Sequence, residues 1–516
     1  MNLSSLTIQS AHRVLAATSS SRLVPPLLAG LLLPFGFAPF HFPGVAILGL
    51  ALLFGLLQYK TAKQAFYTGF IFGLGFLGLG VSWVYVSIHE YGHLNAVVAG
   101  LITLVFIIYL SLFPALVAAT YTRLASNRSL LFSCFLFSAL WCLGEWLRAT
   151  AFGGFPWLTL GFGQIDTPLK YLLPIFGLYG VSFFACLAAT CLAASIQTNS
   201  NKRYMWIIAF VAILLSPSVL RHIEWATIDP KPKAVGIIQA NLSMRDKWDE
   251  GLFWQLLQRY KDNVDQLISK DKLIVMPESA IPLPASYVTD FLNGIHRQAK
   301  LAGSSILLGI PQPTSVDETH YYNTMTTLGD AKGSYLKQHL VPFGEYIPQP
   351  LQRLIDWLAF PSANMSPGES HQSLIRVQNH PIASLICYEL AYPQLLRRQL
   401  PEAEWIVSIS DDGWFGHSFA MYQQLQIAQA ISIQTARYQV VANNDGLSSI
   451  INTKGVITAS LPPFSSGTLE ADIFPASGSS PWVYIGDTPA LFFCLLVIIY
   501  ALLRLKKTAR AGKRAE

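Results

Sequence analysis

The sequence predicts a helical membrane part of about eight helices joined to a polar α/β domain outside the membrane. Of its 516 residues, 52% are hydrophobic and only 12% are charged, whereas a soluble globular protein carries about a quarter charged residues. Apolar runs of about 20 residues, typical of membrane helices, recur through the first 220 residues and once near the C-terminus. Residues 221–484 are polar, with short β-rich runs alternating with helical patterns, which predicts a layered α/β domain.

The eight apolar runs are the candidate membrane helices. Prolines interrupt the first two, so these helices are expected to be short or kinked. A cleaved signal peptide is the alternative for the first run, but no small-residue cleavage site follows it. The runs are Arg22–Phe40, Gly44–Gln58, Gln64–Ile88, Asn95–Tyr121, Leu130–Arg148, Leu169–Ile196, Tyr204–Leu220 and Ile485–Leu503.

The placement of basic residues predicts the orientation. With a cytoplasmic N-terminus, every cytoplasmic segment is basic, while the two short outer loops contain no Lys or Arg, as the positive-inside rule requires. We therefore expect seven helices in 1–220, an outer domain in 221–484, a last helix in 485–503 and a basic cytoplasmic tail in 504–516. Basic residues form no stripe with aromatic residues, so nucleic-acid binding is not expected.

The outer segment shows eight candidate strands and three candidate helices. The strands are Ala234–Gln239, Leu273–Met276, Ser305–Gly309, Tyr322–Thr327, Ile382–Ile386, Trp405–Ser410, Tyr438–Ala442 and Ser448–Ile451. The helices are Gly251–Ile268, Ser286–Ala302 and Tyr422–Ala436.

Polar clusters follow four of these regions, where α/β sheets place their functional groups. Glu278 lies at the end of the apolar strand in the run Leu273–Ser279, and Lys337 lies in a stretch that reaches Glu345. Cys387 follows Ile382–Ile386, and Asp411 and Asp412 follow Trp405–Ser410. Taken singly, each of these residues is more often structural: a packed thiol, a cap, a solvated lysine or a turn.

Together they form a set suited to covalent catalysis. Cys387 is the only one of six cysteines in the polar segment. A thiol attacks only as the thiolate, and a free pKa near 8.5 requires a base, which Glu278 could supply. Lys337 could stabilise the oxyanion formed at a carbonyl. The histidines lack zinc-ligand spacing and no G-x-S-x-G motif fits, so we expect neither a metal nor a cofactor.

The order Glu, Lys, Cys resembles the nitrilase, or carbon–nitrogen hydrolase, superfamily, and more closely its membrane branch, the bacterial apolipoprotein N-acyltransferases. The similarity runs through nearly the whole chain. The motifs that carry it in the outer domain are Lys247–Glu250, Pro277–Pro282, His339–Tyr346, Cys387–Glu389 and Trp414–Gly416. Those in the membrane part are Phe37–Phe40, Val81–Ile88, Glu145–Arg148, Phe155–Leu158 and Gln164–Asp166.

The resemblance implies a nitrilase-like αββα sandwich held on the periplasmic side of the inner membrane. It implies transfer of an acyl chain from a phospholipid, typically phosphatidylethanolamine, to the N-terminal amine of a diacylglyceryl-cysteine on a lipoprotein. A monomer is the default expectation. The implied roles are nucleophile for Cys387, base for Glu278, oxyanion stabilisation for Lys337, support for Glu345, and pocket shaping or acceptor orientation for Trp248, Tyr388 and Glu389.

Several aromatic residues beside these motifs could meet acyl chains, although ordinary core packing is an equal alternative. They are Phe343, Trp414 and Phe415. The apolar stretch Trp357–Phe360 is a candidate lid at the membrane interface. Glu145 and Arg148 are expected to pair with each other, because isolated charges in a membrane are costly.

The chain also departs from the resembled pattern. The nominated triad is untouched, and Gln434 with Val441 lose opposite charges together, as a compensated pair would. Asp411 lies near nothing catalytic in sequence, which leaves turnover and acceptor preference open. The departures are Asp411, Gly413, Gln424, Gln429, Ile431, Gln434, Val441 and Asp445.

Three rival functions remain at this stage. A membrane-tethered nitrilase-type hydrolase would use water in place of an amine acceptor. A degenerate paralogue would bind lipoproteins without reacting. A transporter is disfavoured, because the membrane part lacks paired broken helices carrying buried charges in both halves.

Overall fold

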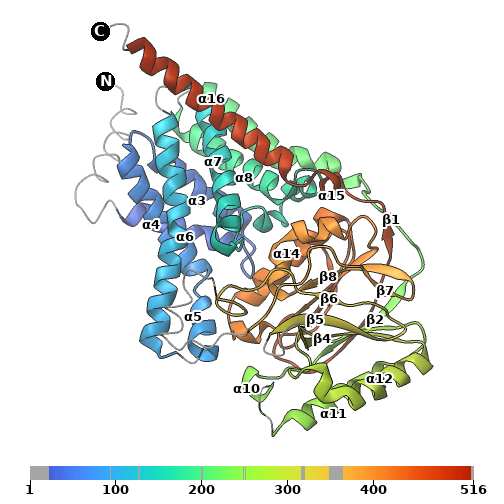
Figure 1. Ribbon diagram of the computed structural model, residues 1–516. Coiled ribbons are helices and arrows are strands. Elements are labelled where there is room, and N and C mark those ends of the chain that lie inside the picture. Colours follow the sequence, from blue (N-terminus) through green and yellow to red (C-terminus); the bar gives the residue numbers. More distant parts are fainter. Residues whose placement is uncertain are drawn as a thin grey trace.

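The computed structural model describes residues 23–512 except 93, 126–127, 199–200, 248, 250, 315–319 and 348–363. A bundle of helices lies at one end of the molecule and a two-sheet domain at the other, and the C-terminal helix α16 returns from the sheets to run along the bundle (Figure 1). The helices of the bundle are α2 (Val24–Leu32), α3 (Pro43–Leu56), α4 (Ala62–Gly80), α5 (Val84–Val86), α6 (Ala96–Ala125), α7 (Leu130–Thr150), α8 (Leu173–Gln197), α9 (Asn201–Leu215) and α16 (Thr488–Gly512).

Apolar helices occupy all eight expected regions, but they differ in length. Among the described residues, five helices are long and apolar enough to cross a membrane, and α4 with the helical turns after it makes a sixth if this pair is one span bent by 63°. The first two helices are shorter, as their prolines predicted: Val24–Gly36 ends in a 3₁₀ turn that contains Pro34, and α3 begins at Pro43.

Small residues bring the membrane helices together. A Cβ atom on Gly69 of α4 would lie 2.5 Å from the backbone oxygen of Pro114 in α6, and one on Gly73 would lie 2.8 Å from the Cα atom of Ser111. The two helices therefore touch backbone to backbone, which is how helices gain packing energy in lipid, where no hydrophobic effect drives them together.

Two six-stranded sheets form the outer domain. Their strand orders are β13-β2-β3-β4-β5-β6 and β12-β11-β10-β9-β8-β7. The central strands β2–β4 and β8–β10 pair in parallel, and the remaining neighbours pair antiparallel. The strands are β2 (Lys233–Gln239), β3 (Leu273–Val275), β4 (Ser305–Pro313), β5 (Tyr321–Gly329), β6 (Tyr335–Leu336), β7 (Ile375–Val377), β8 (His380–Ile386), β9 (Trp405–Ser410), β10 (Gln439–Asn443), β11 (Ser449–Ile451), β12 (Ile457–Ser460) and β13 (Gly467–Ile473).

Alternation along the strands explains the layering. In the first sheet, Ile237 and Val275 face the second sheet, whereas their neighbours Ile238 and Ile274 pack under helices α11 (Phe253–Leu267) and α12 (Thr289–Ala302). The second sheet is covered by α14 (Ala420–Thr435), which also packs on α8 of the bundle. The order of layers is thus helix, sheet, sheet, helix, which confirms the predicted fold class (Figure 1).

All eight expected strands and all three expected helices are present, whereas further strands were missed. These are β6, β7, β12, β13 and the two-stranded pair β1 (Thr227–Ile228) with β14 (Ala476–Ser477). Most are two to four residues long, and β13 is a partly exposed edge strand, so neither length nor hydrophobic alternation marks them. Their partners, rather than local sequence, make them strands.

The buried side chain of Arg437 bonds the backbone of the segment that leads to the last membrane helix. Arg437 is fully buried just after α14, and its guanidinium donates to the backbone oxygens of Ala403 at 2.8 Å, Pro401 at 3.3 Å and Gly478. Because a guanidinium offers five donors in a rigid fork, one side chain bonds three backbone oxygens in two separate segments.

Replacing Arg437 should therefore destabilise the protein. We expect Arg437→Met to lower the free energy of unfolding by about 3 kcal/mol or more, since it leaves several buried carbonyls without donors. Thermal unfolding of the purified full chain in detergent measures this. Arg376→Met is the matched control, because the Arg376–Glu402 ion pair is 50% and 60% exposed and should contribute about 0–1 kcal/mol. Equal losses in the two variants would contradict the assignment.

Candidate active site

The nominated residues, which come from both sheets, meet between them. Glu278 follows β3 and Lys337 follows β6 in one sheet, while Cys387 follows β8 and Asp411 follows β9 in the other. Lys337 Nζ lies 3.2 Å from Glu278 Oε1, and the backbone nitrogen of Asp411 lies 3.1 Å from Glu278 Oε2. Residues that are up to 133 positions apart in sequence thus share one buried cluster.

Asn323, a residue that the sequence analysis missed, joins the two carboxylates of the cluster. Its Nδ2 donates to Glu278 Oε1 at 2.7 Å and to Glu345 Oε1 at 3.0 Å. Glu345 Oε2 accepts from the backbone nitrogen of Val341 at 2.8 Å. A polar residue in the middle of β5 was the available signal, but an isolated asparagine in a strand is weak evidence for a site.

Lys337 is the buried cation of the cluster. It is 1% exposed and contacts Glu345 Oε1 at 2.9 Å as well as Glu278. Burial lowers the pKa of Lys337, but the charges of Glu278 and Glu345 outweigh it and hold the pKa well above its usual value. The ammonium is therefore charged at neutral pH and can stabilise an oxyanion next to it.

Cys387 lies at a sharp turn with a neutral thiol. Its backbone φ is +53°, in the left-handed region, and its side chain is buried. Burial and the charge of Glu278 raise the pKa of the Cys387 thiol well above its usual value, although Lys337 lowers it. The thiol is thus protonated at rest, and attack on a substrate requires a base to remove the proton as the bond forms.

Glu389 does not face an open pocket but organises the loop that carries Lys337. Its Oε1 accepts from the backbone nitrogens of Gln338 at 2.7 Å and His339 at 3.1 Å and from the hydroxyl of Tyr335 at 3.0 Å. Its Oε2 accepts from the backbone nitrogen of Ile386 at 2.8 Å. Burial raises its pKa to about 7, and these donors oppose the rise. The carboxylate ties the Lys337 segment to the strand that ends at Cys387.

Tyr388 connects the cluster to the membrane helices. Its hydroxyl donates to the backbone oxygen of Gly154, just after α7, at 2.9 Å, and its ring stacks on Trp157 at 10° with 6.3 Å between centroids. Phe415 packs against Trp83 with ring centroids 4.8 Å apart. Aromatic side chains thus form part of the contact between the outer domain and the membrane part.

Other aromatic candidates are exposed or undescribed. Phe343 is 39% exposed and Trp414 is 42% exposed, so both are accessible at the surface of the site. The hydroxyl of Ser87 donates to the backbone oxygen of Trp414 at 2.7 Å, which holds this segment against the bent helix pair. Trp248 and the stretch 357–360 lie outside the described residues.

Except for Gln429, which is partly exposed, the departures from the resembled pattern are buried within the domain. With its amide nitrogen toward Asp412, Gln424 donates to Oδ2 at 2.9 Å and accepts from Ser410 Oγ at 3.0 Å. Gln434 and Val441 are both buried and uncharged.

The expected pairing of Glu145 with Arg148 was wrong, since it is absent among the ion pairs of the described residues. Glu145 instead accepts from Trp141 and the backbone of Leu160, and Arg148 donates to the backbone oxygens of Phe155 and Trp157.

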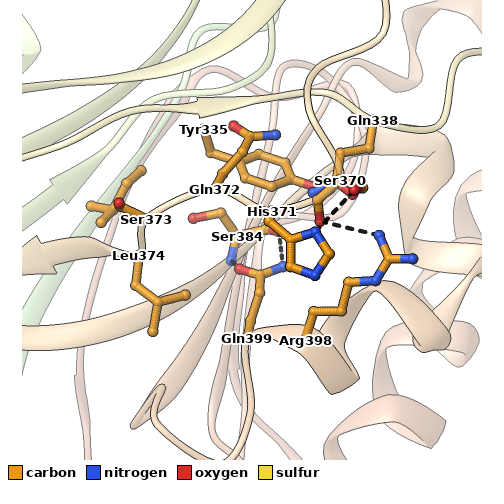
Figure 2. Close-up of a pocket in the computed structure, with 11 residues that line it drawn as sticks. Tyr335, Gln338, Ser370, His371, Gln372, Ser373, Leu374, Ser384, Arg398 and Gln399 are labelled. Atoms are coloured by element: carbon orange, nitrogen blue, oxygen red, sulfur yellow. Dashed lines mark hydrogen bonds between the residues drawn. The ribbon is translucent and has the colours of Figure 1, made fainter.

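Figure 2 shows the side chains that line a hollow of about 70 Å³, which is separate from the cluster. Tyr335, Gln338, Ser384, Arg398 and Gln399 are among its lining residues, and Glu278, Lys337 and Cys387 are not. The backbone of Ser384 bonds both ends of the Gln399 amide, at 2.7 and 3.0 Å, which closes one wall. The described residues contain no group of three or more potential metal ligands.

Comparisons with known proteins match both parts of the chain. A family model described as "Apolipoprotein N-acyltransferase N-terminal domain" matches residues 29–191, and one described as "Carbon-nitrogen hydrolase" matches residues 234–480. Curated relatives named "Apolipoprotein N-acyltransferase" include one from Methylococcus capsulatus, 36% identical over 95% of this chain and 98% of its own. One from Coxiella burnetii is 35% identical over 92% of this chain and 98% of its own.

An amidase from Nesterenkonia sp. is among the solved structures that match about half of the chain. It is 14% identical, with a TM-score of 0.34, and the match covers 51% of this chain and 97% of the amidase. The NitFhit protein of C. elegans matches with 16% identity and a TM-score of 0.36, over 49% of this chain and 62% of that one.

The charge of Glu278 makes a testable prediction about the thiol. Glu278→Gln should lower the pKa of Cys387, because it removes a negative charge and leaves Lys337 in place. The pH dependence of iodoacetamide alkylation, followed by mass spectrometry of the Cys387 peptide, measures this pKa. Glu470→Gln, a remote carboxylate paired with Lys272, is the control and should leave the curve unchanged. A shift to higher pH would mean that Glu278 stabilises the thiolate.

Proposed function

The chain belongs to the apolipoprotein N-acyltransferase family, and we propose that it transfers a fatty acyl chain from a phospholipid to the N-terminal amine of a diacylglyceryl-cysteine. The acyl chain passes through a thioester on Cys387. The observation that carries the proposal is the buried cluster in which Glu278 contacts a charged Lys337 at 3.2 Å and raises the pKa of the Cys387 thiol.

In the first step, Glu278 takes the proton of the Cys387 thiol while the sulfur attacks the ester carbonyl of the phospholipid. The developing oxyanion lies near the Lys337 ammonium, which stabilises it. When the intermediate collapses, the carbon–oxygen bond breaks, Glu278 returns its proton to the leaving alkoxide, and lysophospholipid departs. The acyl chain remains as a thioester.

In the second step, the lipoprotein amine attacks the thioester carbonyl. Glu278 removes a proton from the attacking nitrogen, Lys337 again stabilises the oxyanion, and the carbon–sulfur bond breaks. The proton returns to the Cys387 sulfur and the amide is released. One carboxylate thus serves both half-reactions of the ping-pong exchange.

The protein is an integral membrane protein. We propose that it lies in the inner membrane of a bacterium, with its catalytic domain on the periplasmic side and both termini in the cytoplasm. The alternation of basic loops supports this orientation. Both substrates are lipid-anchored, so a site held against the membrane helices by Tyr388 and Trp157 can meet both. Exposed Phe343 and Trp414 are suited to acyl chains.

Acyl transfer through Cys387 makes a direct prediction. Purified full chain in vesicles of phosphatidylethanolamine with labelled acyl chains should acquire hydroxylamine-sensitive label on the Cys387 peptide. The label should persist until a diacylated lipopeptide is added and then move to the peptide. Cys387→Ala should acquire no label and transfer none. Steady release of free fatty acid without peptide would favour a hydrolase, and transfer by Cys387→Ala would refute the proposed nucleophile.

The hydrogen bonds of Glu389 predict a second effect. Glu389→Gln should slow thioester formation by about tenfold or more, because an amide NH₂ would face backbone donors that now bind a carboxylate, and bonds to charged groups contribute about 1.5–3 kcal/mol. The single-turnover rate of Cys387 labelling measures it. Tyr335→Phe removes only one of the four donors and should cost less. An unchanged rate in Glu389→Gln would show that the Lys337 segment is held by other contacts.

A further inference from the structure

Lys247 and Asp411 form an ion pair almost without solvent contact next to Glu278. Their side chains are 0% and 3% exposed. Lys247 ends the short helix α10 (Met244–Lys247), and Asp411 follows β9 of the other sheet. Burying two charges costs free energy that good geometry must offset, so a pair at this place calls for a specific role.

Both members of the pair hold Glu278. Lys247 Nζ donates to the backbone oxygen of Glu278 at 3.1 Å, and the backbone nitrogen of Asp411 donates to Glu278 Oε2 at 3.1 Å. The other carboxylate oxygen, Oε1, accepts from Asn323 and Lys337. Lys247 thus bonds the backbone of Glu278, Asp411 bonds its carboxylate, and the two residues form an ion pair with each other.

Asp411 is itself fixed in position. Its Oδ1 accepts from Asn444 Nδ2 at 3.1 Å and from the backbone nitrogen of Gly413 at 3.2 Å. The backbone that carries Glu278 is equally constrained: Ser279 has a φ of +46°, and a Cβ atom on Gly309 of β4 would lie 2.6 Å from the Glu278 Cα atom. The Lys247–Asp411 pair therefore joins two fixed parts of the structure, the segment of Asp411 and the backbone of Glu278.

We propose that Lys247 and Asp411 are positioning residues that set the reach and direction of the Glu278 carboxylate for both proton transfers. The inference rests on the proposed function, in which Glu278 is the base. The pair carries no net charge, so it fixes the carboxylate without adding a charge next to the thiol. Asp411, which lies near nothing catalytic in sequence, thereby contacts the catalytic base directly.

The test uses the double variant Lys247→Met/Asp411→Asn in the full chain. Lys247→Met alone would leave a buried carboxylate without its partner and risks misfolding, whereas the double variant keeps net charge and side-chain size. The asparagine can still accept from Asn444 and Gly413. We expect a melting temperature close to wild type, a KM for phospholipid within about twofold, and a kcat for thioester formation lowered by about tenfold to a hundredfold.

A second readout separates positioning from general support. Loosening Glu278 should move the pH curve of Cys387 alkylation toward the curve of Glu278→Gln, which a purely structural defect would not do. Lys272→Met/Glu470→Gln removes a more exposed ion pair, 11% and 58% exposed, at the opposite end of β3 and should change neither kcat nor the curve.

The outcomes are distinct. A double variant with wild-type kcat overturns the proposal, and so does a lowered kcat with an unmoved alkylation curve. Failure of the proposed function would instead appear as a wild-type protein that forms no thioester. The alkylation curve needs no phospholipid, so it decides the positioning role in that case as well.

Discussion

The burial of the Lys337 ammonium between two sheets is the constraint on which the rest of the site depends. An ion of this kind loses several kcal/mol of hydration inside a protein and must be surrounded by opposite charge and hydrogen-bond acceptors. Glu278 and Glu345 supply the negative charge, and the amide of Asn323 donates hydrogen bonds to the Oε1 atom of each. Because each of these groups follows or lies in a strand of one sheet, while Cys387 ends a strand of the other, the sandwich must be complete before the site exists.

The same charge balance explains why the thiol rests in its neutral form. Two carboxylates face one lysine, and their combined charge raises the pKa of the Cys387 thiol beyond what burial alone does. A pre-formed thiolate would be a permanent nucleophile facing the oxidising periplasm that we propose for this domain. A neutral thiol beside a carboxylate becomes a nucleophile only when an electrophile arrives, which suits the proposed transfer between two lipid-anchored substrates.

The sequence predicted the parts of the fold and the site that have local signals. Apolar runs predicted the membrane helices, and polar clusters beside the strands nominated Glu278, Lys337 and Cys387. Asn323 was missed because a single polar residue in a strand has no pattern, and β13 because its pairing with β2 is set by residues more than 200 positions away. Asp411 was judged remote because its contact with Glu278 runs between sheets, and sequence distance carries no information on sheet-to-sheet contacts.

The outer domain and the membrane part share one hydrophobic core. Helix α14 is both the outer layer of the sandwich and a neighbour of α8. Its Gln423 accepts from the indoles of Trp83 at 3.2 Å and Trp157 at 2.9 Å and donates to the backbone oxygen of Gly80, where α4 ends and the chain bends by 63°. One buried amide thus joins the bend, the aromatic layer and the catalytic domain. Since packed cores transmit displacement rather than absorb it, we expect the bent helices and the catalytic domain to move together.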